Sequence, residues 1–277
     1  MRKTVTAKMA SALVAVGFGI VTTQAAFIPL GRTNYFQNFD SLASSGKSKA
    51  MPAGWSFVEY GNNDSQYQAD NGSMTAGGAY SYGNIGSSDR AFGSLRSGGD
   101  GNPASGNFAV FGANFQNAGN SAINRLNISY TGEEWRLGAM GRGQDRLQFQ
   151  YSLNASGVGD SKATWINFPS LDFLTPNLTG VGAHNGDLAA NQTQLSGSIG
   201  FLNIPVSGTF WVRWVDAVLP GGGPEDGLAV DNFSITAVPE AETLAAGAGM
   251  TLLLAFVLWK RSNPVITISS MLGVGSR

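Results

Sequence analysis

The sequence predicts an all-β protein: a jelly-roll-like β-sandwich with an N-terminal signal peptide and a C-terminal hydrophobic anchor helix. Several short segments alternate large apolar residues with polar ones, which is the pattern of strands with one buried and one solvated face. Glycine occurs 38 times in 277 residues, which suits many turns between short strands. Between residues 27 and 237 no stretch has a convincing helical period.

The clearest alternation lies at residues 146–153, where Leu147 and Phe149 share one face and Gln148 and Gln150 the other. Such a segment predicts a strand packed on one side only. About ten strands are expected in all, and the others lie near residues 35–39, 55–60, 91–95, 107–115, 125–130, 134–140, 194–201, 210–215 and 227–235.

One of these segments, residues 107–115, does not alternate throughout. Phe108 and Val110 fall on one face, but Phe111 falls on the other. Gly112 follows directly, and we expect a bulge or bend there that absorbs the shift.

Charge and composition exclude several classes of function. The formal net charge is −1, so no basic field attracts phosphates, and we expect no nucleic-acid partner. The chain has no cysteine, so packing rather than disulfides must hold the domain. The single histidine, His184, excludes most zinc sites, and we expect it on the surface of a loop.

The N-terminus has the three parts of a secretory signal. A basic start is followed by an apolar run at residues 9–21 and by small residues at Thr23 and Ala25. We therefore expect residues 1–25 to direct export and to be removed, with Ala26 as the alternative last residue. The other interpretation is a retained membrane helix, for which the run is short.

The C-terminal region predicts a membrane anchor before processing. Residues 243–259 carry no charge, and as a helix they span about 25 Å, near the lower limit for crossing a bilayer. Lys260 and Arg261 follow directly and belong on the cytoplasmic side. The alternative is a buried C-terminal helix of the domain.

The motif Val238-Pro239-Glu240-Ala241, the apolar segment and the basic pair come in an order that resembles a PEP-CTERM sorting signal. The resemblance implies that an exosortase, a membrane-embedded cysteine protease, cuts the chain near the motif and delivers it to the cell surface. It also implies a bacterium that makes exopolysaccharide. The expected division is a signal peptide at 1–25, a β-sandwich at 26–237, a sorting signal with a transmembrane helix at 238–261, and a tail at 262–277.

A series of local motifs between Asn38 and Thr236 resembles an uncharacterised group of PEP-CTERM surface proteins. The last of them also resembles the closing strand of jelly-roll modules, including carbohydrate-binding ones. These resemblances imply a fold and a location but no reaction. The motifs are Phe39–Leu42, Met51–Trp55, Gly86–Ala91, Tyr130–Arg136 and Asp226–Phe233.

Three aspartates are candidate calcium ligands. Asp226 and Asp231 lie at and within the last expected strand, and Asp40 lies near the first. In jelly-roll modules these strands often lie side by side, and a calcium ion held by carboxylates can join them. The alternative is that Asp40 and Asp226 cap turns while Asp231 accepts backbone hydrogen bonds.

Catalytic and sugar-stacking residues are harder to assign. Glu133 and Glu134 are adjacent, so on a strand they point to opposite faces and cannot act as a catalytic pair. We expect one of them to pair with Arg136 or Arg142 and the other to be solvated. The chain has six tryptophans, most of which are expected in the core, although an exposed aromatic patch could bind a glycan.

The leading hypothesis is an exported, non-enzymatic surface or matrix protein that is sorted by an exosortase-like system and associated with exopolysaccharide. A first alternative is a carbohydrate-binding module with an aromatic glycan site. A second alternative is an extracellular hydrolase with a carboxylate pair that the motifs do not reveal. An exposed aromatic patch favours the first alternative, and two carboxylates converging in a cleft favour the second.

Overall fold

The computed structural model describes residues 26–61, 64–98, 105–217 and 223–239. The predicted signal peptide at 1–25 lies outside these residues, as do Glu240, Ala241, Lys260 and Arg261 and the tail at 262–277. Within the described ranges, no helix has the length and apolarity needed to cross a membrane.

Two mixed β-sheets make up the described chain, and the only helices in it are two single 3-10 turns, η1 (Pro169–Leu171) and η2 (Ala189–Asn191). Sheet A has seven strands: β1 (Ile28–Leu30), β4 (Trp55–Tyr60), β8 (Phe108–Asn117), β10 (Arg146–Ser152), β11 (Ile166–Asn167), β12 (Phe173–Leu174) and β15 (Thr209–Ala217). Sheet B has nine strands: β2 (Tyr35–Gln37), β3 (Lys47–Ser48), β5 (Tyr67–Asp70), β6 (Gly78–Tyr82), β7 (Ala91–Leu95), β9 (Ile123–Leu137), β13 (Gly182–Ala183), β14 (Gln192–Ile199) and β16 (Gly227–Pro239).

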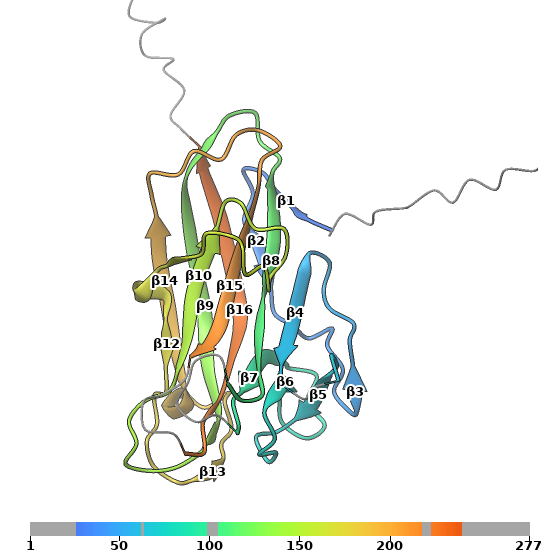
Figure 1. Ribbon diagram of the computed structural model, residues 1–277, viewed down its shortest axis with the longest axis vertical. Helices are drawn as coiled ribbons and strands as arrows, with labels where there is room; N and C mark the ends of the chain where they lie inside the picture. Colours follow the sequence, from blue (N-terminus) through green and yellow to red (C-terminus); the bar gives the residue numbers. More distant parts are fainter. Residues whose placement is uncertain (1–25, 62–63, 99–104, 218–222, 240–277) are drawn as a thin grey trace, which may run out of the picture.

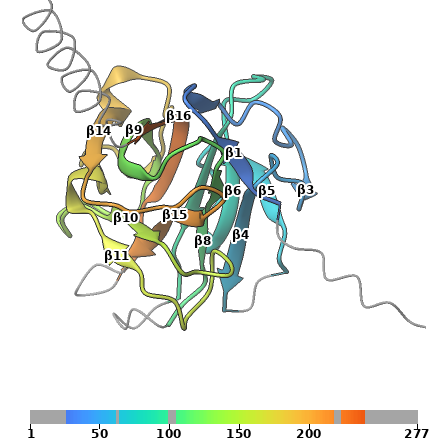
Figure 2. The same ribbon diagram turned by 90° about the horizontal axis from the view of Figure 1, so that it is seen from above.

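The chain passes back and forth between the two sheets. Sheet A contains the order β8-β15-β10-β11, and sheet B contains the order β14-β9-β16-β7. From β7 to β10 and from β14 to β16, successive strands thus alternate between the layers, as they do in a double-sheet jelly roll. Figure 2 shows the two layers, with β14, β9 and β16 in one and β10, β15, β8 and β4 in the other. The predicted all-β sandwich is confirmed.

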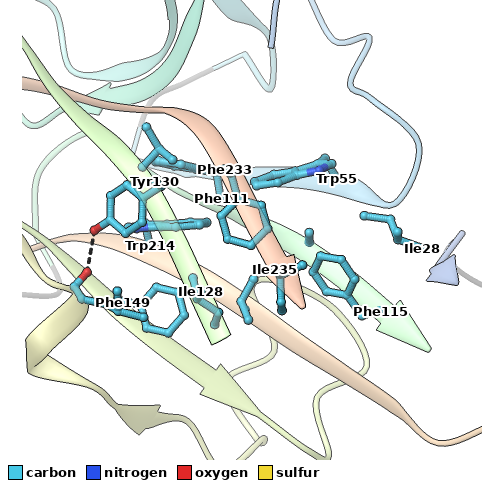
Figure 3. Close-up of a cluster of buried hydrophobic side chains, with 14 of the residues drawn as sticks. Ile28, Trp55, Phe111, Phe115, Ile128, Tyr130, Phe149, Trp214, Phe233 and Ile235 are labelled. Atoms are coloured by element: carbon cyan, nitrogen blue, oxygen red, sulfur yellow. Dashed lines mark hydrogen bonds between the residues drawn. The ribbon is translucent and has the colours of Figure 1, made fainter. Parts of the chain in front are cut away.

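The core lies between the inner faces of the two sheets and is rich in aromatic rings (Figure 3). Trp214 of β15 is fully buried, and its ring centroid lies 5.3 to 5.6 Å from those of Phe111, Tyr130, Phe149 and Phe233. Such ring pairs add about 0.5–1.5 kcal/mol each beyond the area that they bury. The aromatic residues of both sheets therefore stabilise the sandwich in place of disulfides.

The bulge or bend predicted at Gly112 is absent from strand β8, so this sequence prediction was wrong. Its pairing with β4 and β15 keeps a continuous register past this residue. Phe108 and Val110 are buried on the outer face of the sheet, under a second cluster formed with Val158 and Trp211. The strand is apolar on both faces because both are covered, so the slip in alternation did not indicate a bend.

A buried polar network ties the two sheets together at one end of the sandwich. Asp226 precedes β16, and its carboxylate accepts hydrogen bonds from Gly138 N at 2.7 Å and from Thr175 Oγ1 at 2.6 Å. Its own N–H donates to Asp145, which precedes β10 in the other sheet. Arg142 completes the network with two hydrogen bonds to the Asp145 carboxylate, at 2.8 and 2.9 Å.

Candidate functional site

The outer face of sheet A carries the side chains that best fit a binding site. On β15, Phe210, Val212 and Trp214 pack into the core, so Trp211 and Arg213 point away from it. On β10, the outward residues are Gln148 and Gln150, as the alternation predicted. The register places Gln150 of β10 opposite Arg213 of β15.

The loop between β10 and β11 folds back over this face. Val158 is buried against Trp211, and Trp165 packs partly buried beside them. Asp160 fixes the loop, because its carboxylate accepts hydrogen bonds from Ser156 N and Oγ and from Lys162 N at 2.7 to 3.0 Å. These hydrogen bonds, from Ser156 above all, lower the pKa of Asp160 to about 2. The loop is therefore held by its own side chains rather than by a ligand.

An open groove of about 620 Å³ lies between this loop and strand β4. Its floor is apolar and includes Val58 and Trp211. Residues 156–162 of the loop also line the groove, and they include the polar Ser156, Asp160 and Lys162. We call this feature the sheet A groove.

A network of planar polar side chains lies on the same face of the sheet. The Arg213 guanidinium lies 3.5 Å from the centre of the Trp165 ring and donates to Gln150 Oε1 at 2.8 Å. Gln150 Nε2 in turn donates to Asn167 Oδ1 at 2.8 Å. Burial lowers the pKa of Arg213 to about 10, so the guanidinium stays charged at neutral pH. The network holds one charge and two amides in fixed positions.

Apolar surface beside fixed amide and guanidinium groups suits the binding of a sugar better than it suits the catalysis of a reaction. Apolar surface packs against the C–H faces of sugar rings, and planar amide and guanidinium groups fix the orientation of hydroxyls. Glycoside hydrolysis uses two carboxylates on either side of the scissile bond. Among the described residues that line the sheet A groove, Asp160 is the only carboxylate.

The tryptophans lie mostly where the sequence placed them. Trp55, Trp135, Trp211 and Trp214 are all buried, with at most 5% of their surface exposed. Trp165 is partly exposed, but Arg213 covers one face of its ring. Near the sheet A groove, the described chain therefore offers the partly exposed Trp165 and the exposed Tyr60 rather than a broad aromatic platform.

The three aspartates predicted to bind calcium do not all come together: beyond the effect of burial, Asp40 lies near enough to Asp231 to raise the pKa of Asp231, but Asp226 lies apart from both. Asp226 and Asp231 are five residues apart on an extended strand, which separates them by about 16 Å. Asp226 belongs to the network at the end of the sandwich, as a residue that binds backbone and hydroxyl groups. Asp40 accepts from Arg90 N at 3.2 Å, a contact between segments fifty residues apart. No cluster of three or more His, Cys, Asp or Glu side chains in the described ranges has a metal-binding arrangement.

Asp231 lies instead beside Glu133 on the outer face of sheet B. The Asp231 side chain is 3% exposed, and within the described chain its Oδ1 atom has no hydrogen-bond partner. Burial, followed by the nearby Glu133 carboxylate, raises the pKa of Asp231 to about 8. Burial also raises the pKa of Glu133 to about 7. Both groups therefore favour the protonated form near neutral pH.

The sequence predicted that one of Glu133 and Glu134 pairs with an arginine, that the other is solvated, and that His184 lies on a loop surface. The structure differs for all three residues. The two glutamates do point to opposite faces, but both are buried, and within the described ranges neither pairs with an arginine. Glu133 Oε2 accepts from Trp135 Nε1 at 2.9 Å, whereas Glu134 Oε1 lies 2.9 Å from His184 Nδ1. The sequence did not show this pair because the loop that carries His184 returns to β9 only in the folded chain, where His184 N donates to Trp135 O.

The first two residues of the predicted sorting motif belong to the last strand. Val238 and Pro239 continue β16, where they pair with Arg125 and Ile123 of β9. Strand β16 thus continues past the predicted boundary at 237 to Pro239, the last residue that the structure describes. The rest of the sorting motif lies outside the described residues.

Sequence reasoning did not single out Arg213, Gln150 or Asn167 as site residues. The alternation of apolar and polar residues predicted that Arg213 and Gln150 face away from the core. No other sequence pattern indicated a role for them. Nothing in the sequence showed that β10 and β15 are neighbours, since more than fifty residues separate them.

No protein-family model matches the sequence, and no curated protein matches it. Among solved structures, the CBM22-1 xylan-binding domain of Paenibacillus barcinonensis Xyn10C is 11% identical, with a TM-score of 0.34; the match covers 76% of this chain and 99% of that one. The enzymatically active domain of bacteriophage CBA120 tailspike protein 4 is 10% identical, with a TM-score of 0.32, over 72% of this chain and 21% of that one. TmCBM61, solved in complex with β-1,4-galactotriose, is 12% identical, with a TM-score of 0.27, over 56% and 75%. At such TM-scores these similarities do not establish a shared binding activity.

Proposed function

We propose that the sandwich is a non-enzymatic polysaccharide-binding module of an exported surface protein. The observation that supports this most directly is the sheet A groove, with its apolar floor at Val58 and Trp211 and its polar loop residues. The amides of Gln150 and Asn167 and the Arg213 guanidinium lie on the same face, in a fixed hydrogen-bonded arrangement. This is the chemistry that sugar rings need from a protein: apolar contact and planar hydrogen-bonding groups.

The proposal is tested by the retention of the purified full-length chain on cellulose, xylan, galactan and alginate. The test variant is Gln150→Ala combined with Lys162→Ala, which removes one amide from the network and one cation from the loop that lines the groove. Each lost hydrogen bond costs about 0.5–1.5 kcal/mol, so we expect the double variant to bind at least about fivefold more weakly.

Gln66→Ala is the matched control, because Gln66 is exposed and does not line the sheet A groove; it lies beside Lys47 and Asp64. Circular dichroism and the melting temperature show that each variant is folded. A folded wild-type chain that no polysaccharide retains contradicts the proposal, and so does a double variant that binds as well as the control.

Export and exosortase sorting complete the proposed function. The signal peptide at 1–25, the motif Val238-Pro239-Glu240-Ala241 and the basic pair Lys260-Arg261 support them. We expect the surface form to lack residues 1–25 and the tail at 262–277, and Glu240→Ala to cause the C-terminal segment to be retained. Mass spectrometry of the surface form checks this; a mature chain that still ends at Arg277 contradicts it.

A further inference from the structure

The outer face of sheet B carries an uncharged array of hydroxyl and amide groups. Strands β14, β9 and β16 run side by side there, and β2 continues the sheet beyond part of β16 (Figure 1). The inward residues of these strands, such as Ile128 and Ile235, belong to the core. The outward residues form a surface that we call the polar ladder: Asn127, Ser129, Ser196, Ser198, Ser234 and Thr236.

The strand register arranges the ladder in straight rows across the sheet. Ser129 lies opposite both Ser196 and Ser234, and Phe36 of β2 lies opposite Ser234 on the far side. In the next row, Asn127 lies between Ser198 and Thr236 by the same pairings. Adjacent strands are about 4.8 Å apart, so the longer row extends about 14 Å across four strands.

The ladder is open and its central hydroxyls are available. An open groove of about 440 Å³ lies over it. Within the described chain, no hydrogen bond involves the hydroxyl of Ser129 or Ser196. Ser198 Oγ donates to Asn127 Oδ1 at 2.8 Å, and the hydroxyls of Ser234 and Thr236 hydrogen-bond to the Asn34 side chain at 2.8 and 3.0 Å. Phe36 is 54% exposed and closes one end of the longer row with an apolar ring.

The charge pattern indicates what kind of polymer fits this face. The two rows contain no charged side chain, and the next charged residues along β9 and β16 are the exposed Arg125 at one end and the buried Asp231 at the other. An acidic or basic polymer gains no ion pair along the rows. A neutral polymer of hydroxyl groups can both donate to and accept from the serine, threonine and asparagine side chains, and it can place a ring against Phe36.

We propose that the polar ladder is a second polysaccharide-binding surface, specific for a neutral chain. The ladder faces outward from sheet B, and the sheet A groove faces outward from sheet A, so the two sites point away from each other across the sandwich. One molecule thus bridges two polysaccharide chains. This bridging rests on the proposed function of the groove, whereas binding at the ladder stands independently of it.

The test uses the full-length chain with soluble neutral polymers, β-1,4-galactan and hydroxyethyl cellulose, and with alginate as the acidic polymer. The ladder variant is Phe36→Ala combined with Asn127→Ala; its matched control is Phe27→Ala, which removes a phenylalanine of similar exposure outside both sites. Affinity electrophoresis measures binding, and light scattering of mixtures with long polymers measures bridging.

We expect the wild-type chain to bind a neutral polymer and to produce polymer networks that scatter light. The ladder variant keeps binding through the groove but loses the increase in scattering. Gln150→Ala with Lys162→Ala disables the groove. In that chain, we expect the further changes Phe36→Ala and Asn127→Ala to weaken the remaining neutral-polymer binding by about tenfold or more.

Other outcomes overturn one proposal or the other. If the groove changes alone abolish all binding, the ladder is not a site, but the proposed function stands. If the ladder changes alone abolish it, the groove proposal fails and the ladder stands. In the chain whose groove is disabled, equal neutral-polymer binding with and without the ladder changes overturns the ladder proposal, and so does a preference of the remaining site for alginate. The ladder proposal also fails if the ladder variant binds polymer normally but sediments differently from the wild-type chain. The face is then an interface between copies of the chain.

Discussion

Single carboxyl groups make this sandwich sensitive to pH. Asp231 and Glu133 are buried on the outer face of sheet B, and burial raises their pKa to about 8 and about 7. In the unfolded chain such groups ionise near pH 4. Between these values the folded state holds more protons than the unfolded state, so the free energy of unfolding falls as pH rises.

We therefore expect the wild-type chain to be more stable at pH 5 than at pH 8. Asp231→Asn keeps the shape of the side chain but removes its titration, so the decline in the free energy of unfolding over this range becomes shallower. Urea denaturation at several pH values measures the slope. Asp64→Asn is the control: Lys47 lowers the pKa of the exposed Asp64, so this group titrates below the range. A wild-type slope that Asp231→Asn leaves unchanged contradicts the prediction.

At the scale of one element, strand β8 shows how close contact constrains a residue type. It lies between β4 and β15, and both of its faces are covered by apolar side chains. A Cβ atom on Gly112 would lie 2.0 Å from the carbonyl oxygen of Val212 in β15. The glycine is there because the neighbouring strand leaves no room for a side chain, and not because the strand bends.

Gly112→Ala must therefore push β8 and β15 apart. We expect it to lower the free energy of unfolding by about 1–3 kcal/mol or more, the range for overpacked sites. Gly31→Ala is the matched control, because no atom lies within 4 Å of its added Cβ, and it should change stability by less than about 0.5 kcal/mol. Thermal and urea denaturation measure both; an equal effect of the two changes contradicts the close contact.

For the whole molecule, the polar network at one end joins the two sheets. Arg142 is its main cation, with hydrogen bonds to the Asp145 carboxylate and to Pro224 O at 2.6 Å. Arg96, which follows β7 of sheet B, donates from Nε to Asp216 O of sheet A at 3.2 Å. The aromatic core fills the space between the sheets, and this network fixes their relative position at that end.

Arg142→Ala leaves Asp145 buried without its cation. Removing one partner of a buried ion pair costs about 3–5 kcal/mol, and we expect a loss of that size in urea denaturation. Arg146→Ala is the control, because Arg146 is about half exposed and lies 3.7 Å from Asp172; it should cost about 1 kcal/mol or less. Similar losses for the two variants contradict a role of the network in holding the sheets together.

Local pattern alone determined much of this molecule. Alternation at residues 146–153 and 210–215 predicted β10 and β15 and the faces of Gln150 and Arg213, because a strand must turn its apolar side to the core. The strands at 55–60 and 91–95 coincide with β4 and β7. β6 was not predicted, because Gly78–Tyr82 is buried on both faces and does not alternate.

The tertiary structure alone decided which distant residues meet. Asp226 and Asp231, close in sequence, lie in separate surroundings because an extended strand carries them apart. Glu134 and His184, fifty residues apart, form a pair because a loop returns to β9. The sheet A groove and the polar ladder depend on the register of strands that are far apart in the chain. The periodicity of side chains predicts which face of each strand is buried. Which strands pair with each other is determined only when the whole core packs.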